Sequence, residues 1–122
     1  MADETPVDQM TVDVDPDVAP GTVLVRAAGE LDVFTTPLLR DALLRLPLES
    51  LSAVVVDLAG LTFMDSSGLG VLVAAQKKLR PGGGSLRVVC GGGPVLRMLE
   101  ITGLLGTIAV FATVDEALGT AS

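Results

Sequence analysis

Short, continuous apolar runs alternate along this chain with longer stretches whose apolar residues recur every three or four positions. Continuous β-branched runs are typical of strands that are buried on both faces, whereas the wider spacing is typical of amphipathic helices. Strands are predicted at 22–29, 53–58, 85–90 and 107–111, and helices at 36–46, at 66–80, from Pro94 to a stop at Gly103, and after Thr113. This alternation predicts a single α/β domain with a mainly parallel β-sheet flanked by helices.

Two of the predicted helices begin with recognisable capping residues. Thr36 stands before Pro37, the arrangement of an N-cap followed by proline at the first helical position. Thr113 and Glu116 have the spacing of a capping box, in which each side chain accepts a hydrogen bond from the other residue's backbone N–H. We therefore expect the first helix to start after Thr36 and the last helix to start after Thr113.

Residues 1–21 differ in composition from the rest of the chain. They hold six acidic residues ahead of the first basic residue, Arg26, and they are interrupted by prolines. Such a segment buries little apolar surface, and proline is tolerated only at the edge of a sheet. We expect an acidic, partly flexible segment over residues 1–21, with a short edge strand near Met10–Val14, followed by one domain over residues 22–119.

Composition excludes several classes of partner and site. The formal net charge of −7 weighs against binding to nucleic acid or to an anionic membrane. The chain has no His and a single cysteine, Cys90, whose place at the end of an apolar run predicts a buried structural thiol. We expect no metal ion, no cofactor and a cytoplasmic location. The longest uncharged apolar stretch, 101–114, is shorter than the ~20 residues that span a bilayer.

Other patterns that suggest chemistry are incomplete. The acidic run 13–17 is not a calcium loop, because other residues occupy that motif's glycine and closing glutamate positions. The glycine clusters 82–84 and 91–93 complete no phosphate-binding motif and are predicted to form turns. Nothing in the sequence places Asp57 and Asp65 around a common pocket, and without His a Ser-His-Asp hydrolase is excluded. We therefore expect that this chain is not an enzyme.

The segment Asp65–Gly70 carries two adjacent serines at the start of a predicted helix. Either Asp65 or Ser66 suits the N-cap position. At 100° per residue one helical face carries Ser66, Gly70, Val73 and Lys77, and the opposite, sheet-facing side carries Leu69, Leu72, Ala75 and Leu79. The Ser66 face is predicted to be exposed, so these four residues form a candidate docking strip for a partner protein. From these residues alone two interpretations remain, a helix cap and a hydroxyl that another protein modifies.

Three landmarks in order along the chain resemble the STAS domain family, and within it the single-domain anti-sigma-factor antagonists. The resemblance covers about residues 22–118. It is carried by Gly29-Glu30-Leu31-Asp32 with Thr36-Pro37-Leu38, by Val54–Leu58 with Leu61–Gly70, and by Pro94–Arg97 with Thr102–Leu104. It implies a STAS-like mixed sheet over residues 22–119 and a role in partner switching.

In such a switch the unphosphorylated antagonist binds a serine-kinase anti-sigma factor and frees the sigma factor. Phosphorylation by the kinase reverses this binding, and a phosphoserine phosphatase resets the antagonist. The resemblance implies Ser66 as the phosphoacceptor, with Ser67 as the alternative, because the family's acceptor is the first hydroxyl residue after the loop aspartate. The expected partner-binding residues are Asp65, Ser66, Ser67, Gly68, Gly70, Val73 and Lys77.

A second interpretation is compatible with the same resemblance. The chain could be a STAS module that is not phosphorylated, acting as a scaffold in a signalling assembly or as an accessory subunit of a lipid transporter. The two interpretations differ in whether Ser66 or Ser67 accepts phosphate.

Overall fold

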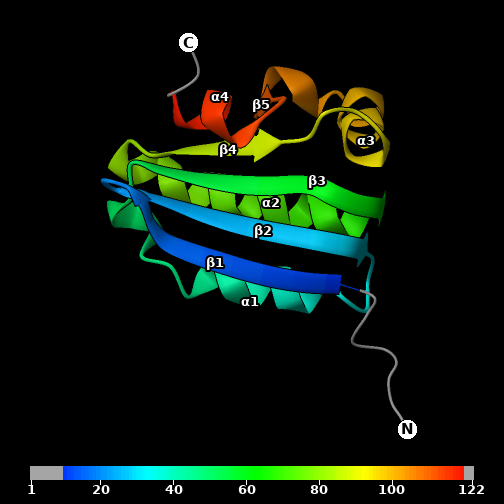
Figure 1. Ribbon diagram of the computed structural model, residues 1–122, viewed down its shortest axis with the longest axis horizontal. Coiled ribbons are helices and arrows are strands. Elements are labelled where there is room, and N and C mark those ends of the chain that lie inside the picture. The colour runs from blue at the N-terminus through cyan, green and yellow to red at the C-terminus, as the bar shows by residue number, and fades with distance from the viewer. Residues whose placement is uncertain (1–9, 120–122) are drawn as a thin grey trace, which may run out of the picture.

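The computed structural model describes residues 10–119, and in this part of the chain five strands form one sheet in the order β1-β2-β3-β4-β5 (Figure 1). The strands are β1 (Met10–Ala19), β2 (Thr22–Leu31), β3 (Ala53–Met64), β4 (Ser85–Val89) and β5 (Ala109–Phe111). The helices are α1 (Thr36–Leu44), α2 (Ser66–Leu79), α3 (Pro94–Thr102) and α4 (Val114–Leu118). Short 3-10 turns lie at Leu48–Ser50, Arg80–Gly82 and Leu104–Gly106.

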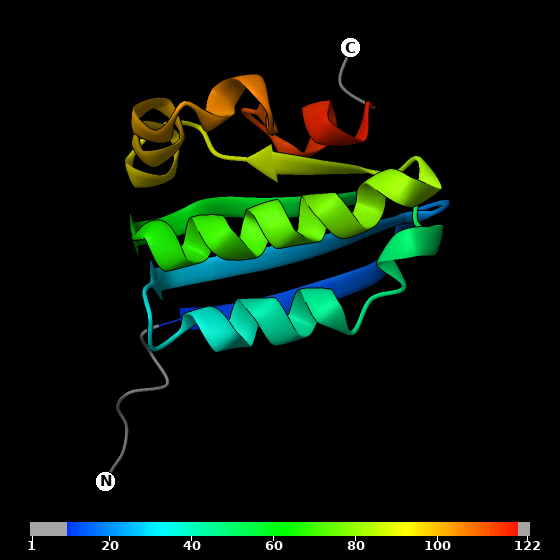
Figure 2. The same ribbon diagram turned by 180° about the vertical axis from the view of Figure 1, so that it is seen from behind.

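The sheet is mixed and mainly parallel. β1 pairs antiparallel with β2, whereas each of the other neighbouring pairs is parallel. The helices α1 and α2 lie side by side on one face of the sheet (Figure 2). This arrangement confirms the predicted fold class.

The centre of β3 is buried from both sides, which explains its continuous apolar run. Val54, Val55 and Val56 are each 0% exposed. Val54 and Val56 belong to the main core with α1 and α2, whereas Val55 packs in a smaller core with Ala117 of α4. Alternate side chains of a strand point to opposite faces, so both faces of β3 require apolar residues.

The strand β1 is longer than the edge strand predicted near Met10–Val14. It runs to Ala19 and pairs with nearly the whole of β2, with a register shift between Asp15 and Ala19. Pro16 lies within this irregular part. Because β1 is an edge strand with one neighbour, the backbone N–H that proline lacks is not needed to pair with a second strand. The acidic segment 1–21 was expected to be partly flexible and to precede the domain. Its residues Met10–Ala19 instead belong to the sheet, because they pair with β2, and its first nine residues lie outside the described residues.

Both capped helix starts were predicted, one of them a residue off. Thr113 is the N-cap of α4, and its side chain accepts a hydrogen bond from the Glu116 N–H at 3.1 Å, which is one half of the expected capping box. The Glu116 side chain accepts from the Ala112 N–H at 3.1 Å, one residue before the expected partner. The first helix begins at Thr36 itself, and its N-cap is Thr35, which makes no side-chain cap hydrogen bond. The Thr36 hydroxyl instead donates to the Asp32 carbonyl oxygen. The prediction of Thr36 as the N-cap was therefore wrong, because the hydroxyl turns back to the loop after β2.

Besides the end of β1, three strand boundaries and one helix end differ from the prediction by two residues or more, and one of them is the end of β2, at Leu31 instead of Gly29. β3 continues from the expected end near Leu58 to Met64, because it stays paired with β2 as far as Leu31. Gly60 allows this close pairing, since a Cβ there would lie 2.9 Å from the Cβ of Ala28. The helix α1 ends at Leu44, two residues earlier than expected, and β5 starts at Ala109, two residues later.

Helix α2 packs on the sheet through the side that the sequence predicted. Leu69, Leu72, Ala75 and Leu79 are all buried. Gly68 is buried as well, and a Cβ at this position would lie 2.6 Å from Leu31 Cδ2 and 3.1 Å from Met64 Cγ. Gly70 is different, because a Cβ there meets nothing within 4 Å. The first turn of α2 therefore approaches the ends of β2 and β3 more closely than a side chain at residue 68 would allow.

The contrast between the two glycines can be tested with one substitution at each. Gly68→Ala should destabilise the domain by about 1–3 kcal/mol, because the added methyl group overpacks the buried Leu31 side chain. Gly70→Ala should instead stabilise it by up to ~1 kcal/mol, because alanine is the better helix former and the space is open. Urea unfolding of the three proteins measures both changes. Equal effects of the two substitutions would contradict the packing of α2.

Candidate functional site

The candidate site lies where β3 ends and α2 begins, at the carboxyl edge of the parallel strands (Figures 1 and 2). Asp65 links the two elements and has extended backbone angles. Its N–H donates to the Leu31 carbonyl oxygen at 3.1 Å, which joins the ends of β3 and β2. The site is thus fixed to the two central strands of the sheet.

Asp65 is the N-cap of α2, one of the two positions that the sequence favoured. Its Oδ1 atom accepts a hydrogen bond from the Ser67 N–H at 2.9 Å and another from the Ser67 hydroxyl. The hydroxyl bond is the largest cause that holds the pKa of Asp65 below its ordinary value, and the backbone N–H groups of Ser67 and Gly68 act in the same direction. The carboxyl group is therefore held in its ionised form at neutral pH.

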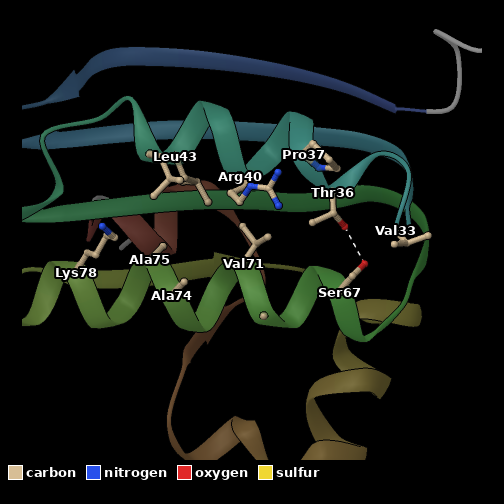
Figure 3. A pocket seen from close by; sticks show the side chains of 12 residues that line it. Val33, Thr36, Pro37, Arg40, Leu43, Ser67, Val71, Ala74, Ala75 and Lys78 are labelled. Atoms are coloured by element: carbon tan, nitrogen blue, oxygen red, sulfur yellow. Dashed lines mark hydrogen bonds between the residues drawn. The ribbon is translucent and has the colours of Figure 1, made fainter.

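The Ser67 hydroxyl is engaged on two sides. It donates to Asp65, and its oxygen lies 2.8 Å from Thr36 Oγ1, the contact drawn as a dashed line in Figure 3. Each of the two hydroxyls has one proton and a second acceptor, the Asp65 carboxylate for Ser67 and the Asp32 carbonyl oxygen, 2.6 Å away, for Thr36. Either hydroxyl can be the donor in the contact between them. Ser67 is half-buried and connects the first turns of α1 and α2.

The loop between β2 and α1 is held by its own hydrogen bonds. Asp32 Oδ1 accepts from the N–H groups of Phe34 and Thr35, at 2.9 and 3.0 Å. The Thr35 hydroxyl donates to the Glu30 carbonyl oxygen at 2.7 Å. These bonds leave Val33 and Phe34 at the tip of the loop, where they are 62% and 83% exposed.

Ser66 lies in a different environment from Ser67. Its side chain is exposed, and in the part of the chain that the structure describes its hydroxyl makes no hydrogen bond. Gly70 and Lys77 on the same face are exposed as well, whereas Val73 is half-buried and packs against the core. The predicted strip along α2 is therefore accessible, with Val73 contributing only part of its surface.

Gly68 does not lie on this strip. It is buried against Leu31 and Met64, so it sets the position of the helix and not the access of a partner. Gly68 was expected among the partner-binding residues, but its burial leaves it no exposed surface of its own on this strip. The exposed small residue of the segment is Gly70.

The structure adds residues to the site that sequence reasoning missed. Val33 lies near Ser67 at the first turn of α2 (Figure 3), and the exposed Phe34 follows it in the same loop. Phe63, near the end of β3, is 47% exposed. Two of the three Phe residues stand close to motifs already singled out, Phe34 before Thr36-Pro37 and Phe63 before Asp65. Exposed apolar side chains near such motifs often mark a binding surface, so these positions were a signal that the sequence offered.

The structure also shows the surroundings of Cys90 and Asp57, two residues considered as candidate sites from the sequence. Cys90 is buried, as predicted, and burial raises the pKa of its thiol. Asp57 forms an ion pair with Arg26 at 3.3 Å. Among residues 10–119 no group of three His, Cys, Asp or Glu side chains is arranged to hold a metal ion. No helix in this range has both the length and the apolar character needed to cross a bilayer.

Comparison with known proteins gives consistent matches. Residues 12–117 match the STAS domain family. The chain is 35% identical over 103 residues to the anti-sigma-B factor antagonist of Bacillus subtilis (strain 168), covering 84% of this chain and 94% of that protein. It superposes on the crystal structure of an anti-sigma factor antagonist from Mycobacterium paratuberculosis with a TM-score of 0.82 and 34% identity, covering 94% of this chain and 95% of the other.

A more distant structure shares the fold alone. The Bacillus cell fate determinant SpoIIAA, solved in its phosphorylated form, superposes with a TM-score of 0.69 at 24% identity. The superposition covers 89% of this chain and 97% of SpoIIAA.

The lowered pKa of Asp65 predicts a pH-dependent stability. A carboxyl group with a depressed folded-state pKa stabilises the fold above its unfolded-state pKa of ~3.9, and this contribution is lost as the pH falls through the folded-state value. Asp65→Asn should therefore be less stable than the unchanged protein at pH 7, and the difference should shrink below about pH 4. Urea unfolding across this range measures it. Ser67→Ala, which removes the hydroxyl donor, should weaken the pH dependence, and a difference that stays constant with pH would contradict the assignment.

Proposed function

The chain belongs to the STAS domain family, and from that premise we propose that it is an anti-sigma-factor antagonist that acts by partner switching. In its unphosphorylated form it binds a serine-kinase anti-sigma factor and releases the sigma factor. Phosphorylation of Ser66 by that kinase ends the interaction, and a phosphoserine phosphatase restores it. Relatives that match most of the chain at 35% identity and are named anti-sigma factor antagonists support this role.

The contrast between the two serine hydroxyls carries the assignment of Ser66. A phosphoacceptor must present a free oxygen lone pair to the incoming phosphorus atom. The Ser66 hydroxyl is exposed and makes no hydrogen bond within residues 10–119, whereas the Ser67 hydroxyl is held by Asp65 and Thr36. Phosphorylation of Ser67 would break the contact between α1 and α2, and phosphorylation of Ser66 would not.

The proposed reaction needs a catalyst from outside the chain. Ser66 Oγ attacks the γ-phosphorus of ATP, the bond from that phosphorus to the β,γ-bridging oxygen breaks, and ADP leaves. The serine proton passes to a base on the kinase, since this chain has no His and Asp65 already accepts hydrogen bonds from Ser67. A phosphorylated form of SpoIIAA, which has the same fold, is compatible with a modified hydroxyl on this scaffold.

The proposed docking surface surrounds Ser66. It includes the N-cap Asp65 and the strip residues Ser66, Gly70, Val73 and Lys77. We add the exposed Val33, Phe34 and Phe63 at the same edge of the sheet. Ser67 and Gly68 contribute from below, by holding the first turn of α2 in place. Exposed aromatic and aliphatic side chains around a small polar centre are typical of protein-binding surfaces.

Phosphate on Ser66 should affect binding far more than folding. A phosphoserine carries about −1.5 to −2 charges near neutral pH. At the start of α2 these charges meet the positive end of the helix dipole, worth ~0.3–1 kcal/mol, while the neighbouring Asp65 carboxylate repels them. Within an interface the same dianion loses its water, which costs several kcal/mol unless the partner supplies new hydrogen bonds.

The acceptor assignment is tested by mapping phosphate with mass spectrometry after incubation with candidate anti-sigma kinases and ATP. We expect phosphate on Ser66 in the unchanged protein and in Ser67→Ala, and none in Ser66→Ala. Ser66→Ala should still bind the kinase, because the unmodified form is the one that binds. Phosphate on Ser67 would overturn the assignment, and absence of phosphate with every kinase would favour an unphosphorylated STAS scaffold.

The mechanism of the switch is tested by comparing phosphorylated and plain protein in a thermal melt and in a titration with the kinase. Affinity should fall at least a hundredfold, about 2.7 kcal/mol, while the melting temperature changes by no more than a few degrees. Ser66→Asp should imitate the effect partially, because it adds a single charge. If lost binding accompanies a large drop in melting temperature, the switch works by unfolding instead.

A further inference from the structure

A groove of about 450 Å³ runs between α1 and α2 on the outer side of the two helices (Figure 3). Its apolar walls include Leu43 and Leu44 from α1 and Val71, Ala74 and Ala75 from α2. Small-molecule sites usually measure ~300–1,000 Å³ and have predominantly apolar walls. The groove therefore has the size and lining of a small-molecule site.

Small residues leave the space that forms the groove. The Thr36–Ser67 contact joins the first turns of α1 and α2, and both residues line that end of the groove. Further along, α2 presents Gly70 and Ala74, where larger side chains would fill the space. The opening is thus a property of both helices and not of one flexible side chain.

The charges at the groove are of one sign. Arg40 from α1 and Lys78 from α2 line it, and no acidic residue does, although the whole chain carries 15 acidic and 8 basic residues. Arg40 approaches a carboxylate only at 4.0 Å, that of its chain neighbour Asp41. Within the described residues Lys78 has no ion-pair partner. Both cations are available to an anion in the groove.

The two cations lie at different heights along the groove, with Arg40 near Val71 and Lys78 near Ala75 and Leu43 (Figure 3). Either cation can donate hydrogen bonds to a carboxylate head group that enters the groove. A second hollow of about 350 Å³ shares Leu44 and Lys78 with the groove, but Glu49 and Ser50 line it as well. The apolar chain of a ligand therefore stays within the groove between α1 and α2.

We propose that this groove binds a single-chain amphiphile with a carboxylate head, a ligand of the fatty-acid type. The alkyl chain packs against the leucine and alanine side chains, and the carboxylate accepts hydrogen bonds from Arg40 or Lys78. The proposal does not depend on phosphorylation of Ser66, because the ligand is expected to bind the unphosphorylated protein without any partner.

Three probes separate the contributions of head and chain: decanoate, butyrate and decyltrimethylammonium, each below its micelle concentration. Titration of the isotope-labelled full chain, followed by backbone amide NMR shifts, gives both affinity and location. Decanoate should saturate, with the largest shifts in α1 and α2. Butyrate, which lacks the long chain, and decyltrimethylammonium, which has the opposite charge, should each bind at least tenfold more weakly.

Matched variants locate the ligand. Ala74→Leu fills the groove from an exposed helical position and should reduce decanoate affinity at least tenfold without changing the melting temperature by more than a few degrees. Arg40→Gln or Lys78→Gln should weaken binding at least fivefold, and the variant that does so identifies the position of the head. Arg45→Gln and Lys77→Gln are the controls, because these exposed cations lie outside the groove, and they should leave the affinity unchanged.

Three results would each overturn the proposal. The first is no saturable decanoate binding, and the second is equally strong binding of decyltrimethylammonium. The third is a set of shifts confined to Phe34, Phe63 and their neighbours, which would place the amphiphile on the docking surface. None of these results bears on whether Ser66 is phosphorylated, so the two proposals fail separately.

Discussion

Asp65 makes a set of hydrogen bonds on which the geometry of the site depends. Its backbone N–H joins the end of β3 to Leu31 in β2, and its carboxylate accepts both the N–H and the hydroxyl of Ser67. Ser67 in turn contacts Thr36 at the start of α1. One residue therefore orients two strands and two helices relative to each other, and a rigid first turn of α2 follows from it.

This arrangement gives two neighbouring serines different chemical states. Successive residues of a helix are rotated by ~100°, so Ser66 and Ser67 cannot face the same surroundings. Ser67 turns toward α1 and completes the cap, whereas Ser66 turns outward. Asp65 thus accepts the hydrogen bond from a backbone N–H at the start of α2, and the Ser66 hydroxyl is not needed for this capping. That hydroxyl remains available to a partner.

Two surfaces with different character adjoin the first turns of α1 and α2. At the carboxyl edge of the strands, Phe34 and Phe63 are exposed beside a small polar residue, Ser66. Between the helices lies an apolar groove lined by Arg40 and Lys78, and its end shares Val33 and Gly70 with the docking surface. The first surface suits a protein partner, and the proposed ligand of the groove is a thin anionic chain, because a groove between two helices accommodates a chain better than a broad interface.

Local sequence patterns determined most elements of the fold. The buried run of β3, the sheet-facing side of α2 and the cap of α4 follow from periodicity and capping chemistry, which act over a few residues. The exposed position of Ser66 follows from helical geometry in the same way. The family resemblance added the expected phosphoacceptor, which local patterns alone left beside the simpler interpretation of a helix cap.

Contacts between distant residues decided the rest. The full length of β1 depends on pairing with β2, and the extension of β3 to Met64 depends on the same partner strand. Thr36 and Ser67 are 31 positions apart, so no local pattern indicated that their hydroxyls meet. The packing role of Gly68 and the groove between α1 and α2 likewise arise only when the helices dock on the sheet. Sequence alone determined which side of α2 packs on the sheet, whereas the tertiary structure determined which elements face one another, because that depends on docking distances that no single element encodes.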